Sequence, residues 1–190
     1  MEGRTMNDID YIIPILKKYH TAFTNKTSPN IKTNKPDALM DIFGITTELQ
    51  EKNKQYWGRE LGMIWQLLVT EVCKHHCHSF KPAFRVEIYE PCDLIVGRDA
   101  IDTKYRVGSG DSGTLAKFRQ NSNILKNFGF KPIMLIFRDD NLPSAIKTCE
   151  YGGWTVYVGQ QAFKYIERIT GVNLYRLLVG LKGCFLLHRS

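Results

Sequence analysis

The sequence contains no long apolar run. No stretch approaches the roughly 18–20 consecutive apolar residues that a membrane-spanning helix requires, so we expect no such helix. The first residues, MEGRTMNDIDYIIP, contain early acids and lack the apolar stretch of a signal peptide. We therefore expect no secretory signal.

Cysteines are few and irregularly spaced. The chain has 5 of them, an odd number that does not suit a disulfide framework. This pattern predicts reduced thiols and a cytoplasmic protein. The cluster CKHHCH at 73–78 lacks the second ligand pair of a structural zinc site, so we expect it to end a helix instead.

Acidic residues are also scarce relative to basic ones. The 190 residues include 26 Lys and Arg against 19 Asp and Glu, for a net charge of +7. With 43% apolar and 24% charged residues, the chain can bury a core and is not disordered. The basic excess favours a polyanionic partner without identifying it.

Hydrophobic periodicity predicts an α/β fold with a mixed central sheet, an antiparallel meander plus further strands, flanked by helices. Residues 25–36 are polar and basic, and form either a linker or a DNA-facing arm. The expected elements are helices at 7–23, 36–43 and 57–74, meander strands at 84–89, 94–96 and 100–107, then helix 115–127, strand 132–137, helix 142–150, strand 154–158 and helix 160–169.

The most informative segment is the predicted hairpin around Gly97. A two-residue turn at Arg98 and Asp99 would pair Gly97 with Ala100 and place Asp93 opposite Lys104. Because side chains alternate along a strand, Asp102 and Lys104 share one face whatever the turn. Asp93 joins them on that face only if the register holds.

Two carboxylates beside one lysine carry more negative charge than the lysine can neutralise. A divalent cation resolves this, and Mg²⁺ is commonly held by one or two carboxylates and completed by water and phosphate. The set Asp93, Asp102 and Lys104 therefore predicts metal-assisted hydrolysis of a phosphodiester.

This segment resembles the PD-(D/E)xK nuclease superfamily, and most closely type II restriction endonucleases. Asp93 lies in Pro91-Cys92-Asp93, one residue further from the proline than in the motif, which leaves Glu90 as an alternative for its role. Asp102-Thr103-Lys104 matches the (D/E)xK element, and the element order over 57–138 is similar to the superfamily core.

The resemblance implies a homodimer from a restriction-modification system that hydrolyses double-stranded DNA to 5′-phosphates. Asp93 and Asp102 would bind Mg²⁺, and Lys104 would assist the attacking water. The alternatives are a DNA repair or recombination nuclease similar to a resolvase, or a non-catalytic DNA-binding module.

Further candidates surround this set. Glu60 and Glu71, eleven residues apart, fall on nearly one helix face, and either one could reach a second metal ion. Ser112 or Thr114 could cap the following helix. Phosphate contacts are expected in and after the Gly/Ser loop, from Arg106, Ser109, Ser112, Thr114, Lys117 and Arg119.

We expect a single nuclease domain over 1–190. Within it, residues 1–55 would serve recognition or dimerisation, 57–138 would form the catalytic core, and 139–190 would be a C-terminal α/β extension.

Overall fold

The computed structural model describes residues 10–24, 36–83, 85–86, 88–108 and 111–187. The predicted loop at 25–36 lies almost wholly outside these ranges. The chain divides into two compact units, Met1–Val72 with Asn173–Ser190, and Cys73–Val172.

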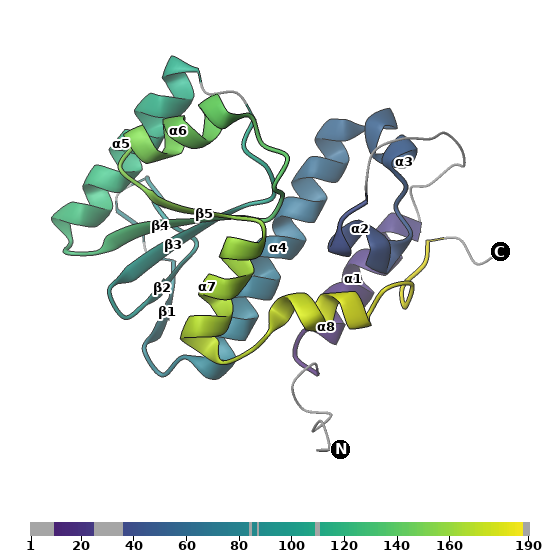
Figure 1. Cartoon of the computed structure of the whole chain (residues 1–190). Helices are drawn as coiled ribbons and strands as arrows, with labels where there is room; N and C mark the ends of the chain where they lie inside the picture. Colours follow the sequence, from purple (N-terminus) through teal and green to yellow (C-terminus); the bar gives the residue numbers. More distant parts are fainter. Residues whose placement is uncertain (1–9, 25–35, 84, 87, 109–110, 188–190) are drawn as a thin grey trace. The chain divides into compact units, whose positions relative to one another are not determined.

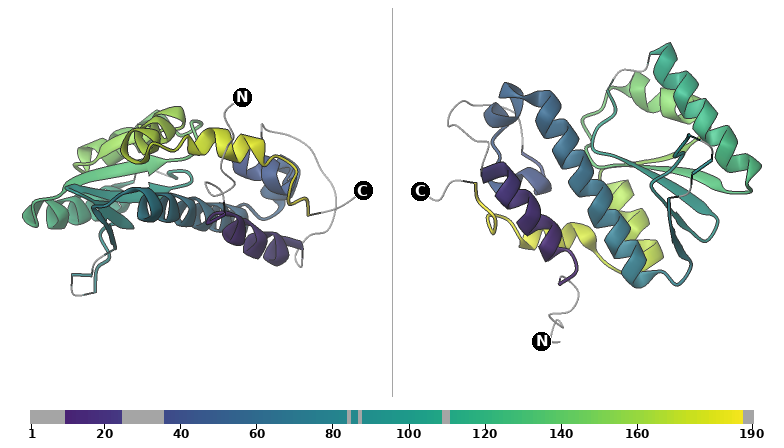
Figure 2. Two further views of the ribbon diagram at one scale, coloured as in Figure 1. Left: turned by 90° about the horizontal axis from the view of Figure 1, so that it is seen from below. Right: turned by 180° about the vertical axis from the view of Figure 1, so that it is seen from behind.

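The unit of Met1–Val72 and Asn173–Ser190 is helical. It contains α1 (Ile13–Thr24), α2 (Ala38–Phe43), α3 (Thr47–Lys52), α8 (Leu174–Gly180) and most of α4 (Lys54–His76), which is one continuous helix (Figure 2). Phe23 of α1 is fully buried in this unit, with its ring centroid 5.0 Å from that of Phe43 and 4.9 Å from that of Trp57. Helices α1, α2 and α4 confirm three predicted helices, whereas α3 and α8 were not predicted.

The unit Cys73–Val172 is built on a five-stranded mixed sheet in the order β1-β2-β3-β4-β5. Strands β1 to β3 pair antiparallel, and β3, β4 and β5 pair parallel. The predicted α/β class with a mixed sheet is confirmed. The strands are β1 (Phe80–Pro82), β2 (Leu94–Val96), β3 (Asp99–Lys104), β4 (Lys131–Ile136) and β5 (Thr155–Val158), and the helices are α5 (Ser112–Asn127), α6 (Pro143–Tyr151) and α7 (Gln160–Thr170).

Helices cover both faces of this sheet (Figure 1). Met134 and Ile136 of β4 belong to a buried cluster that also contains residues of α5 and α6. On the other face, Phe137 follows β4 and lies edge-on to Phe163 of α7, with ring centroids 5.5 Å apart. Because side chains alternate, each β3 residue can be assigned to the α5/α6 face or to the α7 face.

The strand predicted at 84–89 is wrong. Val86 and Tyr89 form an isolated bridge to each other, with both N–H···O distances at 2.9 Å. Ile88, expected on a buried side, is 88% exposed. The alternating pattern therefore belongs to a local turn, and the first strand is β1, where Phe80 pairs with Val96 of β2.

All five cysteines are free thiols, which confirms that they form no disulfide framework. His75 and His76 lie in the last turn of α4, as expected for the 73–78 cluster. Among the described helices, none is long and apolar enough to cross a membrane.

Candidate active site

The β2–β3 hairpin turns one residue earlier than predicted. Val96 pairs with Asp99 and Ile95 with Ala100, so the turn residues are Gly97 and Arg98. Gly97 has φ 60°, a left-handed conformation that glycine adopts without a steric penalty. The predicted turn at Arg98 and Asp99 is therefore wrong.

The same shift overturns the predicted pairing of Asp93 with Lys104. Leu94 pairs with Ile101, so continuing the register by one residue brings Asp93 across from Asp102. Moving a turn of fixed length by one residue changes every partner by two positions. Because the side-chain period is also two, the face is preserved while the neighbour changes.

Asp93 is anchored at the end of the β2–β3 ladder. Its N–H donates to the Ile101 carbonyl at 2.8 Å. Its Oδ2 then accepts from the Thr103 N–H at 2.7 Å and from the Thr103 hydroxyl at 2.6 Å. A side-chain carboxylate thus occupies the place where a backbone carbonyl would continue the ladder, and its position is fixed by two donors.

Thr103 was not among the predicted site residues. Strand alternation places it on the α7 face, where it is 7% exposed, and its hydroxyl still reaches Asp93. The available signal was a hydroxyl residue between the two charged residues of the Asp-x-Lys element. Strand alternation alone predicts that such a residue lies on the face opposite the two charged residues, and so outside the site.

Asp102 and Lys104 form a direct ion pair on the α5/α6 face. Lys104 Nζ lies 2.5 Å from Asp102 Oδ2, and the side chains are 37% and 14% exposed respectively. Lys104 Nζ also donates to the Thr103 carbonyl at 3.2 Å. The ammonium is therefore held by two oxygens, and the Lys104 side chain is partly exposed.

The charges of the site are not balanced. Burial, and then the negative charge of Asp102, raise the pKa of Asp93 from the ordinary 3.8 to about 6, against the opposing effects of Lys104 and Thr103. Burial alone would lower the pKa of Lys104, but the two carboxylates outweigh it and the pKa is raised. One fully charged lysine thus leaves an excess of negative charge.

This donor set fits a hard cation that needs few protein ligands. The described residues contain no group of three or more His, Cys, Asp or Glu able to hold a metal ion. Asp93 and Asp102 offer carboxylate oxygens only, which suits Mg²⁺, an ion that keeps several waters. The raised pKa of Asp93 marks where added positive charge would be most stabilising.

Two buried thiols lie beside the carboxylates. Cys92 is 2% exposed and Cys149 of α6 is 0% exposed. Burial, and then the charges of Asp102 and Asp93, raise the pKa of Cys92 to about 12, and burial raises that of Cys149 to about 11. Both are neutral thiols that form apolar surroundings for the carboxylates.

A family model described as ApaLI-like restriction endonuclease matches residues 83–182, which is more than half of the chain and includes Asp93, Asp102 and Lys104. The chain belongs to this restriction endonuclease family. The predicted resemblance to restriction endonucleases is confirmed, and membership implies a nuclease that binds DNA. No curated protein and no solved structure matches the chain.

The other acids predicted for this nuclease are Glu60, Glu71 and Glu90. Glu90 is exposed and pairs with Arg85 at 3.3 Å. Glu60 pairs with Arg59 at 2.9 Å. Glu60 and Glu71 both lie on α4, in the unit that contains Met1–Val72, and their role at a metal stays a prediction.

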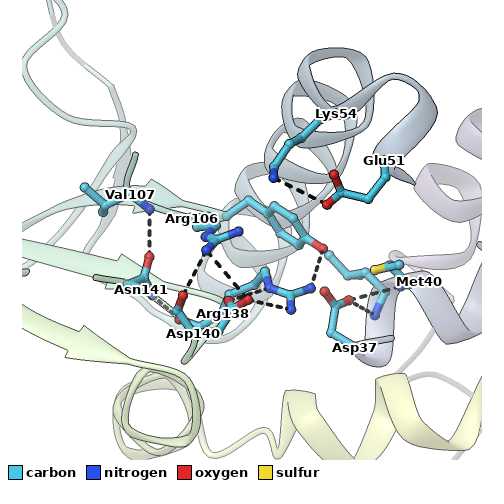
Figure 3. Close-up of polar contacts among 11 residues, drawn as sticks. Asp37, Met40, Glu51, Lys54, Arg106, Val107, Arg138, Asp140 and Asn141 are labelled. Carbon is cyan, nitrogen blue, oxygen red and sulfur yellow. Dashed lines mark hydrogen bonds and ion pairs between the residues drawn. The ribbon is translucent and has the colours of Figure 1, made fainter. Parts of the chain in front are cut away.

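The segment that follows β3 is hydrogen-bonded to the segment that follows β4 (Figure 3). Asn141 accepts from the Val107 N–H at 2.8 Å and donates to the Arg138 carbonyl at 2.5 Å. Arg106 donates to the Asp140 carbonyl at 3.1 Å. Hydrogen bonds from Arg138 lower the pKa of Asp140, so Arg106, a predicted DNA contact, lies in a network that already contains a carboxylate.

Helix α5 starts earlier than predicted. Its N-cap is Asp111, whose Oδ1 accepts from the Thr114 N–H at 2.7 Å, so the expectation that Ser112 or Thr114 provides the cap is wrong. A negative cap is favoured at a helix N-terminus, and it fixes Ser112 and Thr114 in the first turn. Ser109 lies outside the described residues.

The surface of α5 is basic. Residues 112–138 contain no acid. Lys117, Arg119 and Lys126 are exposed on α5, and Lys131 is exposed at the start of β4. Buried residues of α5 pack against the sheet face that carries Asp102 and Lys104.

Proposed function

We propose that this chain is a type II restriction endonuclease that hydrolyses double-stranded DNA at a specific sequence, requires Mg²⁺ and leaves 5′-phosphates. The observation that carries the proposal is the convergence of Asp93, Asp102 and Lys104 at the end of the β2–β3 hairpin, inside the segment that matches the family model.

Asp93 and Asp102 are the residues that would hold Mg²⁺. When bound there, the ion would act as a Lewis acid on the scissile phosphate and lower the pKa of a water. Thr103 fixes Asp93 through two hydrogen bonds, so the carboxylate needs little reorganisation to bind a ligand.

Lys104 acts as a cation in this proposal rather than as a base. The charges around it raise its pKa, so at neutral pH the ammonium is retained and can donate to the attacking water or to a phosphate oxygen. The water oxygen bonds to phosphorus, the bond from phosphorus to the 3′ oxygen breaks, and a proton passes to the leaving 3′ oxygen. The products are a 5′-phosphate and a 3′-hydroxyl.

The basic surface of α5 supports backbone binding. Lys117 and Arg119, with Arg106, Ser112 and Thr114 nearer the end of β3, are the proposed phosphate contacts. A homodimer would cleave both DNA strands by placing one active centre on each strand. Residues 1–55 would serve recognition or dimerisation. A restriction function would place the protein with cellular DNA, in the cytoplasm.

Plasmid digestion tests the proposal. Wild type with Mg²⁺ should produce discrete fragments whose sequenced ends share one motif and carry 5′-phosphates, and EDTA should abolish them. Asp102→Ala should not cut but should bind DNA in EDTA at least as well as wild type, since a negative charge facing phosphate has been removed. Asp139→Ala is the matched control at an exposed aspartate.

Two results would replace the proposal. Cutting confined to branched substrates would indicate a repair or recombination nuclease. Binding without any cleavage, with and without Mg²⁺, would indicate a non-catalytic DNA-binding module. Cutting at the normal rate by Asp102→Ala would show that the catalytic centre assigned to Asp93, Asp102 and Lys104 is wrong.

A further inference from the structure

Helix α7 and strand β5 line a cavity of about 470 Å³ that is open to the surface. It belongs to the same unit as the candidate active site. Its lining combines aromatic rings with cationic and amide side chains, from Val156, Tyr157, Gln161, Lys164, Tyr165 and Arg168.

The aromatic wall of the cavity is held in place. The Tyr165 hydroxyl donates to Asp99 Oδ2 at 2.7 Å. The rings of Tyr157 and Tyr165 pack with centroids 4.8 Å apart, and the Arg168 guanidinium lies 4.9 Å from the Tyr165 centroid. A guanidinium stacked on a ring keeps its N–H groups directed outward for a ligand.

Within the described residues, neither Lys164 nor Arg168 is ion-paired with a carboxylate. Both side chains are exposed. They are four residues apart on α7, about 6 Å along the axis. Like charges at this spacing repel, and an anion between them removes the penalty.

The cavity does not belong to the candidate catalytic centre. Tyr157 pairs with Leu135 of β4, which pairs with Thr103 of β3, so these residues share the α7 face. Asp102 and Lys104 lie on the opposite, α5/α6 face. An anion bound by Lys164 and Arg168 is therefore not the phosphate attacked at the hairpin.

We propose that this cavity is a second DNA contact that takes phosphates of the duplex backbone, with Lys164 and Arg168 as the binding charges. The proposal rests on the proposed function for its DNA substrate. Two cations about one helical turn apart can neutralise neighbouring phosphates, and the tyrosine wall orients Arg168 without reading sequence.

The test is the salt dependence of DNA affinity. A labelled duplex is titrated with protein in EDTA at 50–200 mM KCl, and fluorescence anisotropy gives the dissociation constant. Each lost phosphate contact should reduce the slope of log affinity against log salt by about 0.9. Lys164→Gln/Arg168→Gln should therefore lower the slope by about 2 and weaken binding at 50 mM KCl by roughly tenfold or more.

Two control variants separate contact from net charge and from folding. Lys164→Arg/Arg168→Lys keeps both charges and should retain the slope. Lys81→Gln/Lys147→Gln, at exposed positions of β1 and α6, removes the same net charge and should change the slope far less. An unchanged slope in the Lys164→Gln/Arg168→Gln variant, or an equal loss in the Lys81→Gln/Lys147→Gln control, overturns the proposal.

Cleavage distinguishes this proposal from the proposed function. With Mg²⁺ and saturating DNA at low salt, Lys164→Gln/Arg168→Gln should keep the wild-type turnover rate, because the cavity lies on the sheet face opposite Asp102 and Lys104. A reduced slope in a protein that never cuts DNA would support the contact and refute the nuclease. Loss of turnover at saturating DNA would place the cavity in the catalytic machinery and overturn its assignment as a separate contact.

Discussion

Replacing Asp93 with Asn should make the metal-free protein more stable at neutral pH. The substitution removes a charge that burial and Asp102 disfavour, and it keeps an oxygen that can accept from Thr103. Conservative loss of a hydrogen-bonded carboxylate ordinarily destabilises a protein. The opposite sign is therefore a specific test of the electrostatics of this site.

The magnitude follows from the pKa of Asp93. The difference between the ordinary 3.8 and about 6 corresponds to about 3 kcal/mol of free energy disfavouring the charged form in the folded protein. Solvent at the site screens part of this, so we expect a gain of about 1–2 kcal/mol. For a chain of this length, that raises Tm by about 2–8 °C.

The pH dependence has a defined sign. The unfolded chain releases the Asp93 proton near pH 3.8 and the folded chain near pH 6. The penalty in wild type is thus fully present above pH 6 and fades as the pH falls from 6 towards 3.8. The advantage of Asp93→Asn should be large at pH 7.5, about half as large at pH 5 and small near pH 4.

Thermal unfolding in EDTA measures this at several pH values. Asp10→Asn, at an exposed position, is the control and should change stability by less than about 0.5 kcal/mol. Added Mg²⁺ should raise the Tm of wild type more than that of Asp93→Asn and so narrow the gap. Equal or lower stability of Asp93→Asn at pH 7.5 would refute the charge imbalance inferred here.

Substitutions at four further positions test separate contacts. Thr103→Val should raise the Mg²⁺ concentration needed for half-maximal cleavage and reduce the Tm gain caused by Mg²⁺, and Thr103→Ser should restore both; no difference between the two would leave Thr103 without a positioning role. Lys104→Gln should lower the cleavage rate by about 10²-fold or more while the protein still binds DNA in EDTA, as expected for a lost preorganised donor. Asp111→Ala should cost about 1 kcal/mol in denaturant unfolding through the lost α5 cap, and no loss would contradict the cap. Tyr165→Phe should cost about 1–3 kcal/mol because the Asp99 carboxylate loses its donor, and an unchanged midpoint would show that water replaces it.

Much of the parallel half of the sheet could be predicted from local pattern. The run at 132–137 is apolar on both faces because helices cover both sides of β4, and the run at 154–158 precedes a helix of clear periodicity. The pairing of Asp102 with Lys104 was predictable for a similar reason. Strand alternation fixes it without knowledge of any partner strand.

The wrong predictions were the position of the hairpin turn and the strand at 84–89. Both are decided by a local backbone conformation or a local hydrogen bond that the hydrophobic pattern does not specify. The turn lies at Gly97 rather than after it, because glycine accepts the left-handed conformation that the turn requires. The pattern at 84–89 alternates correctly, yet Val86 and Tyr89 bond to each other instead of to a neighbouring strand. An alternating pattern predicts that a segment has one apolar and one polar side, but it does not predict which segment pairs with it.

Sequence reasoning missed the role of Thr103 for a geometric reason. Alternation assigns its side chain to the face away from Asp102, but the Asp93 carboxylate continues the ladder in the plane of the sheet and can be reached from Thr103. Side chains that replace backbone partners at a strand end do not follow the two-residue period.

The neutral thiols beside the carboxylates give the protein an internal reporter. Cys184 is exposed and should react with a thiol reagent at once, whereas Cys92 and Cys149 can react only when the α5/α6 side of the sheet opens. Their labelling rates therefore measure the free energy of local opening around Asp93 and Asp102 in the unmodified chain. Comparing those rates with and without Mg²⁺ or DNA would show how firmly a ligand closes this part of the fold.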